Sequence, residues 1–216
     1  MKAWETLGEA TTPDGCTFVL RRRDTHYIIV ADGFNLMVSN EHRSESEMVA
    51  LACPLPPAGA RVLIGGLGMG FTLRAALDQL PEDASVVVAE LVPEVIAWNR
   101  GALGGLTRHP LDDPRVVVEL GDVADLVRTS EASFDAVLLD VDNGPDALSH
   151  DTNGWLYTLA GLAALKGALR PDGALAVWSA HDEPGFPRRL RIAGLAPTVH
   201  RIRAADSHAV VFVGRN

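Results

Sequence analysis

The chain has 216 residues, of which 47% are hydrophobic and 22% charged, a composition typical of a globular protein with one domain and a small appendage. Its 19 Lys and Arg against 28 Asp and Glu give a net charge of −9, which argues against a nucleic-acid partner. No apolar run approaches the ~20 residues that a membrane span needs, and the first residues lack the pattern of a signal peptide. Cys16 and Cys53 offer neither a disulfide framework nor metal-ligand spacing. We therefore expect a cytoplasmic protein without membrane contact or metal.

The first forty residues predict a small antiparallel β unit. Its strands are expected at residues 17–23, 26–31 and 34–38. Asp32 and Gly33 form a strong tight-turn signal between the second and third of these strands. A helix capped by Asn40 or Ser44 is expected to follow and to run to about Cys53.

Prolines and a glycine in residues 54–59 end that helix and place the domain boundary. We expect residues 1–58 to form the β-hairpin unit with its helix, and residues 59–216 to form a larger α/β domain. Buried strands and amphipathic helices alternate in this second part. Strands are expected at residues 62–64, 85–89, 115–119, 134–139, 174–178, 198–202 and 208–213, with helices at 71–77, 94–103, 122–128, 155–169 and 187–193. The pattern predicts a mostly parallel sheet, covered on both faces, with an antiparallel final strand.

A glycine cluster follows the first strand of the larger domain. The sequence RVLIGGLGMG over residues 61–70 runs from a buried strand into a turn that contains Gly65, Gly66, Gly68 and Gly70. Glycines allow positive φ in a tight strand-to-helix turn and let the backbone approach a ligand closely. The spacing does not fit G-x-G-x-x-G, because Gly70 falls one position early, and this disfavours a nicotinamide-dependent oxidoreductase.

Acidic residues stand where the next strands end, at Glu90, Asp122 and Asp140. In a parallel sheet these carboxyl ends lie at one rim, where ligands bind. Glu90 can accept hydrogen bonds from a ribose diol, and Asp122 can accept one from an adenine amine. Asp122 is equally well placed to cap the following helix. Together with the glycine turn, this layout indicates a nucleoside that carries a charged tail.

These segments resemble the spermidine synthase family of aminopropyltransferases, which shares the class I methyltransferase fold. The resemblance covers residues 32–178, and its main motifs are VLIGGLGMGFTLRAAL, VAELVPEVI, VVVELGDV and FDAVLLDVDNGP. It implies a Rossmann-like catalytic domain for residues 59–216. It also implies a ribose-binding acid at Glu90, an adenine-side acid at Asp122 and a catalytic acid at Asp140.

The chain departs from the family pattern at three places. The family's glycine motif is GGGDGG, whose acid holds the amine tail of the aminopropyl donor, and Gly68 stands at that position. A tyrosine of the family's polyamine site has its matching place near Glu45. The family's catalytic loop resembles DSSDPxGP, whereas residues 140–145 read DVDNGP. The sequence thus keeps the nucleoside half of the site and alters the polyamine half.

The lack of an acid at position 68 determines which donor we expect. Without a carboxylate at Gly68, a donor that keeps its own carboxylate is repelled less, since two like charges ~4 Å apart near a protein surface repel by roughly 4 kcal/mol. We therefore expect S-adenosylmethionine as co-substrate and methyl transfer to a small amine acceptor. The alternatives are aminopropyl transfer from decarboxylated S-adenosylmethionine to a polyamine, and a non-catalytic nucleoside-binding relative.

The acceptor is expected near Asp140, which could take a proton from an attacking amine or orient it. Asp142 is suited to a cationic acceptor, although a loop turn with Asn143 and Gly144 explains it equally well. Further candidate acceptor contacts are Glu45, Tyr157 and His181, together with Trp155 and Trp178, for which packing is the competing explanation. The resemblance also implies a homodimer.

Overall fold

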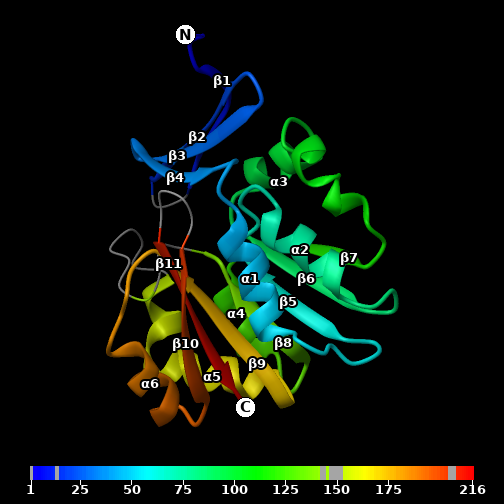
Figure 1. Cartoon of the computed structure of the whole chain (residues 1–216), viewed down its shortest axis with the longest axis vertical. Helices are drawn as coiled ribbons and strands as arrows, with labels where there is room; N and C mark the ends of the chain where they lie inside the picture. Colours follow the sequence, from blue (N-terminus) through cyan, green and yellow to red (C-terminus); the bar gives the residue numbers. More distant parts are fainter. Residues whose placement is uncertain (1, 13–14, 142–144, 146–152, 204–207) are drawn as a thin grey trace.

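The computed structural model describes every residue except 1, 13–14, 142–144, 146–152 and 204–207. It contains two sheets, and Figure 1 shows the smaller N-terminal sheet lying beyond one end of the larger α/β part. The smaller sheet has the strand order β1-β2-β3-β4, all antiparallel. Its strands are β1 (Glu5–Thr11), β2 (Thr17–Arg23), β3 (His26–Ala31) and β4 (Phe34–Val38). The three strands predicted here are confirmed, and β1 was not predicted.

Strand β1 carries no alternating apolar pattern that would have revealed it. Only Ala10 of this strand is buried, and β1 is held by its pairing with β2. Gly8 lets β1 approach α3, because a Cβ at this position would collide with the indole nitrogen of Trp98. The strand therefore depends on tertiary contacts that its own sequence does not predict.

The larger sheet has seven strands in the order β10-β11-β9-β8-β5-β6-β7. Strands β5 to β9 are parallel, and β11 runs antiparallel between β9 and β10. The strands are β5 (Arg61–Gly65), β6 (Ser85–Glu90), β7 (Val116–Leu120), β8 (Phe134–Leu139), β9 (Leu169–Ser179), β10 (Ala196–Arg203) and β11 (His208–Arg215). The predicted fold class, a mostly parallel sheet with an antiparallel final strand, is confirmed.

Helices cover both faces of this sheet (Figure 1). One face carries α1 (Arg43–Ala52), α2 (Phe71–Gln79) and α3 (Pro93–Arg100), and the other carries α4 (Val123–Thr129), α5 (Leu159–Ala168) and α6 (Phe186–Ile192). Short 3₁₀ helices lie at Gly104–Thr107, Pro110–Asp112 and Asn153–Tyr157. The predicted helix over residues 155–169 is therefore interrupted at Thr158, whose side chain caps α5. Leu169, the last residue of the predicted helix, instead opens β9.

Helix α1 begins differently from the prediction. Its N-cap is His42, which makes no side-chain capping hydrogen bond, and the ring of His42 stacks on Phe71 at 4.4 Å between centroids. The predicted caps Asn40 and Ser44 do not serve, because Ser44 lies inside the first turn and donates to Glu45 instead. Met48, Val49 and Ala52 pack into the core of the larger sheet. The division at residues 58 and 59 remains a prediction.

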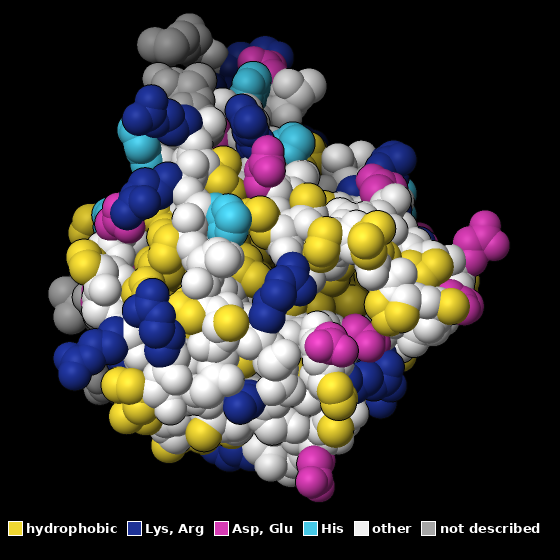
Figure 2. All heavy atoms as spheres, turned by 60° about the horizontal axis from the view of Figure 1, so that its bottom comes forward, with side chains coloured by type: hydrophobic (Ala, Val, Ile, Leu, Met, Phe, Trp, Pro, Cys, Tyr) yellow, Lys and Arg dark blue, Asp and Glu magenta, His cyan; other side chains and the backbone are white. Residues whose placement is uncertain are grey.

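Surface features add two observations. None of the described helices is long and apolar enough to cross a membrane. The face turned forward in Figure 2 carries Lys and Arg side chains scattered among acidic and hydrophobic ones. On the described part of that face the basic side chains form no continuous stripe of the kind that follows a nucleic-acid backbone.

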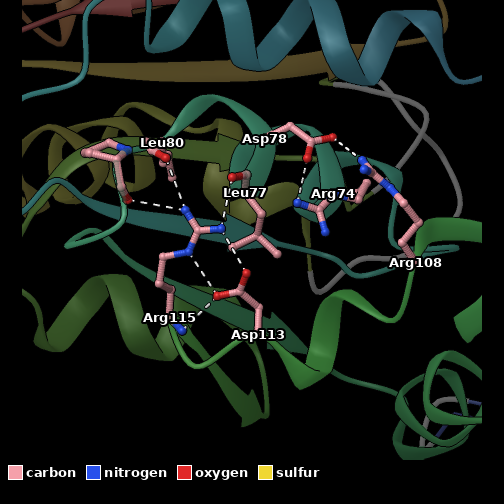
Figure 3. A network of polar contacts seen from close by, with 8 residues as sticks. Arg74, Leu77, Asp78, Leu80, Arg108, Asp113 and Arg115 are labelled. Atoms are coloured by element: carbon pink, nitrogen blue, oxygen red, sulfur yellow. Dashed lines mark hydrogen bonds and ion pairs between the residues drawn. The ribbon is translucent and has the colours of Figure 1, made fainter.

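Arg115 fastens the end of α2 to the start of β7 (Figure 3). Its guanidinium makes a bidentate contact with Asp113 at 2.9 and 2.8 Å. The same group donates to the carbonyls of Leu77 and Leu80, at the last turn of the helix and its exit, and shares the carbonyl of Pro81 with the amide of Ala84. This pairing lowers the pKa of Asp113 to about 2.

We expect Arg115→Met to lower the free energy of unfolding by about 2 kcal/mol, because it removes charge-assisted bonds and exposes carbonyls that lose their donor. Because the folded pKa of Asp113 lies below its ordinary 3.8, the wild type should lose this stability as the pH falls from about 4 to about 2. Urea unfolding at pH 7 and pH 3 measures both effects. Arg43→Met, at an exposed pair, is the matched control. Equal stability of the two variants at pH 7 would contradict the capping role.

Candidate active site

The glycine turn after β5 brings three strand ends together. Gly66, Gly68 and Gly70 have φ values of +87°, +51° and +82°, a region that side-chain-bearing residues rarely adopt. Gly66 lies directly against the backbone carbonyl of Asp140, where a Cβ would collide. The amide of Gly66 donates to Ala89 at 2.9 Å, and that of Asp140 donates to Gly65 at 2.9 Å. The turn is thus fixed against the ends of β6 and β8.

Glu90 holds the turn from the end of β6. One carboxylate oxygen accepts the amide of Leu67 at 2.9 Å, and the other accepts the amide of Val92 at 2.8 Å. The side chain is 7% exposed, and burial raises its pKa although these backbone donors act in the opposite direction. Sequence reasoning placed Glu90 at the rim but missed its role in fixing the turn. Its contact with a ribose stays a prediction.

Asp122 caps helix α4, with its side chain accepting the amide of Ala124 at 2.8 Å. Of the two roles that the sequence offered, the structure shows the helix cap. Asp122 also lines a groove of about 350 Å³ between the end of β7 and α4, together with Leu120 and Leu126. Its contact with an adenine amine remains a prediction.

Asp140 follows the last residue of β8. It accepts a hydrogen bond from the hydroxyl of Thr72, at the start of α2, over 2.7 Å. Burial raises the pKa of Asp140, and the Thr72 hydroxyl opposes this by stabilising the ionised form. Trp178, near the end of the neighbouring strand β9, packs against the core on the α1 side of the sheet. The indole nitrogen of Trp178 is buried and has no hydrogen-bond partner among the described residues.

Glu45 brings a second carboxylate from α1. It is only 5% exposed and accepts a hydrogen bond from the hydroxyl of Ser44 at 2.7 Å. Its pKa is raised to about 7, first by burial and then by repulsion from Asp140. No Lys, Arg or His among the described residues forms an ion pair with either carboxylate, hereafter the Glu45–Asp140 pair. Two buried acids of this kind favour a positively charged ligand.

Met37 and Asn99 support the turn from either side, and sequence reasoning missed both. The thioether of Met37, on β4, accepts the amide of Met69 at 3.3 Å. A Cβ at Gly68 would lie 3.0 Å from the methyl group of Met37. The buried amide of Asn99 donates to the carbonyl of Gly68 at 2.8 Å. The two residues in each contact are more than thirty positions apart in the sequence, so no local sequence pattern predicts these contacts.

The remaining predicted residues lie elsewhere. Tyr157 is 5% exposed and packs edge-on against Phe186 at 6.0 Å, in the core of the α5 and α6 face rather than beside Glu45. His181 is exposed after β9, and its neighbour Asp182 binds Arg201 at 2.7 Å. Asp142 lies outside the described residues. The acceptor roles of Tyr157, His181 and Asp142 stay predictions.

Metal ligands were not expected, and the described part of the chain holds no group of three or more His, Cys, Asp or Glu residues placed to bind a metal ion. The features to be explained are therefore the glycine turn, the acids at the strand ends and the Glu45–Asp140 pair.

Comparison with known proteins identifies the family. The family model described as spermine/spermidine synthase domain matches residues 41–183. The chain belongs to this family. A polyamine aminopropyltransferase of Mycobacterium tuberculosis (strain ATCC 25618 / H37Rv) is 33% identical over 194 residues, which cover 85% of this chain and 36% of that protein. Polyamine aminopropyltransferase 1 of Hyperthermus butylicus is 32% identical over 141 residues, 63% of this chain and 47% of that protein. The chain thus spans less than half the length of these curated relatives.

Solved structures agree with the fold. A spermidine synthase from Thermotoga maritima superposes with a TM-score of 0.77 at 20% identity, covering 97% of this chain and 72% of that one. A spermidine synthase in complex with the transition-state analogue AdoDATO gives the same TM-score at 19% identity, with the same coverage. At this level of identity the likeness establishes the fold and leaves the chemistry to the site.

We expect Thr72→Val to raise the pKa of Asp140, because removing the hydroxyl donor destabilises the ionised carboxylate while keeping the shape of the side chain. Carboxyl ¹³C NMR titration of the wild type and the variant measures this shift. Thr129→Val, an exposed site on α4, is the control. An unchanged Asp140 titration would show that the Thr72 contact does not set its charge.

Proposed function

We propose that this protein transfers an aminopropyl group from decarboxylated S-adenosylmethionine to an amine acceptor. The observation that carries the proposal is the Glu45–Asp140 pair beside the glycine turn. The tail of this donor ends in an ammonium group and carries no carboxylate, which suits two buried acids. Membership of the spermine/spermidine synthase family supports the same chemistry.

The expected methyl transfer from S-adenosylmethionine finds no support in these relatives, which are described as polyamine aminopropyltransferases. The physical argument for methyl transfer is also weaker. That argument depended on the missing acid at Gly68, but Glu45 adds a buried carboxylate close to Asp140. A donor carboxylate near either acid would be repelled by roughly 4 kcal/mol at ~4 Å. Aminopropyl transfer, the alternative, is therefore the function we propose.

For the nucleoside part of the donor, we propose contacts with the glycine turn, Glu90 and Asp122. Each carboxylate oxygen has room for a second hydrogen bond beyond the backbone amide that it accepts. A ribose diol can donate to Glu90, and an adenine amine can donate to Asp122. The glycines let this turn adopt positive φ and pack closely against its neighbours.

The reaction is an in-line displacement. The lone pair of a neutral acceptor amine attacks the carbon next to the sulfonium sulfur, the new C–N bond forms, and the C–S electron pair leaves with neutral methylthioadenosine. The proton lost by the amine goes to Asp140, directly or through water. Holding nitrogen, carbon and sulfur in line supplies much of the rate. A homodimer remains a prediction.

We expect Asp140→Asn to lower kcat by about 10²- to 10⁴-fold, the range typical of a lost general base, and to weaken donor binding far less. The assay incubates the protein with decarboxylated S-adenosylmethionine and a set of diamines, and detects the aminopropylated amine and methylthioadenosine by mass spectrometry. Asp172→Asn, at an exposed position of β9, is the matched control. Full turnover by Asp140→Asn would make that residue structural. Methylated amines formed from S-adenosylmethionine, with no aminopropylated product, would refute the proposed function.

A further inference from the structure

We propose that Glu45 is a specificity-determining residue, whose carboxylate binds a ligand ammonium group together with Asp140 in place of an acid in the glycine turn. This inference rests on the proposed function and names the chemical group that the altered half of the site selects. Three observations carry it: the surroundings of Gly68, the position of Glu45 and the absence of an ion pair to either carboxylate among the described residues.

The turn leaves little space for a side chain at position 68, because one would crowd Met37. Gly68 has a φ of +51°, which is strained for a residue with a Cβ. An added Cβ would lie 3.0 Å from the methyl carbon and 3.2 Å from the sulfur of Met37. Met37 is held there by the amide of Met69. Strand β4 therefore covers this side of the turn with an apolar side chain.

Glu45 supplies a buried carboxylate from α1. It projects from the first turn of α1, is held by Ser44 and lies within electrostatic reach of Asp140. The described groups around it do not neutralise the pair. Glu41, before the helix, adds a further negative charge, and His42 stacks on Phe71 of α2.

A structural glutamate and a ligand-binding glutamate differ in their effect on stability. The folded pKa of about 7 lies above the ordinary 4.5, so the folded state binds this proton more tightly than the unfolded state. The free energy of unfolding must then fall as the pH rises from about 4.5 to about 7. Glu45 thus destabilises the empty protein above neutral pH, a cost that a bound ammonium group removes.

The first test is therefore the stability of Glu45→Gln without any ligand. We expect the variant to unfold at a higher temperature than the wild type at pH 8 and to differ little at pH 5. Glu47→Gln, on the exposed face of the same helix, should show no such pH dependence. A Glu45→Gln protein that is less stable than the wild type at pH 8, or that does not fold, would overturn the inference.

The second test is binding by calorimetry at pH 8, with 1,4-diaminobutane, decarboxylated S-adenosylmethionine and methylthioadenosine as probes. We expect Glu45→Gln to weaken one or both amine-bearing probes roughly tenfold or more and to leave methylthioadenosine unchanged. Loss confined to the diamine assigns the ammonium group to the acceptor, and loss confined to the sulfonium compound assigns it to the donor tail. Wild-type affinity of Glu45→Gln for both amines would overturn the inference.

Failure of this inference is distinct from failure of the proposed function. A Glu45→Gln protein that keeps wild-type affinity for both amines and still transfers aminopropyl groups refutes only the role of Glu45. A wild-type protein that binds amines through Glu45 but forms no aminopropylated product refutes only the proposed reaction.

Discussion

Two carboxylates, Glu45 and Asp140, are held within electrostatic reach of each other and largely away from water. This pairing is the constraint on which the site depends. Burial first, and then repulsion from Asp140, raises the pKa of Glu45 to about 7, and the hydroxyls of Ser44 and Thr72 oppose the cost of the two charges only in part. A protein tolerates such an arrangement when the surrounding fold fixes it, and here both acids project from elements packed into one core. The pair costs stability in the empty protein and gains its partner when a cation binds.

The fold supplies the rigid frame for this pair. The glycine turn lies against the backbone of Asp140, Glu90 ties the turn to β6, and Thr72 ties α2 to the carboxylate. The N-terminal sheet contributes Met37, which closes the side of the turn where the family pattern has an acid. In the proposed function, the carboxylate that binds the amine together with Asp140 comes from Glu45 on α1 rather than from the turn. Selection of the amine then depends on a position where the chain departs from the family pattern.

Much of this frame could be predicted from the sequence because it follows from local pattern. Buried runs alternating with helices predict a parallel sheet, and the carboxyl ends of such strands must meet, which brings Glu90, Asp122 and Asp140 to one rim. The residues that hold them could not be predicted in this way. Met37 and Asn99 reach the turn from elements more than thirty residues away, and β1 forms only because β2 pairs with it. Glu45 stood out as a departure from a family pattern, but its burial and its proximity to Asp140 required the fold.

The account's central claim is that the site selects a donor tail with an ammonium group and no carboxylate. The most direct test is competitive binding of decarboxylated S-adenosylmethionine and S-adenosylmethionine to the wild-type protein at pH 8, above the pKa of about 7 of Glu45. The two compounds share the nucleoside and the sulfonium and differ only in the tail carboxylate, so the ratio of their dissociation constants isolates the interaction at issue. The account predicts that the decarboxylated compound binds at least about tenfold more tightly, a difference of about 1.4 kcal/mol. Equal affinities, or tighter binding of S-adenosylmethionine itself, would contradict it.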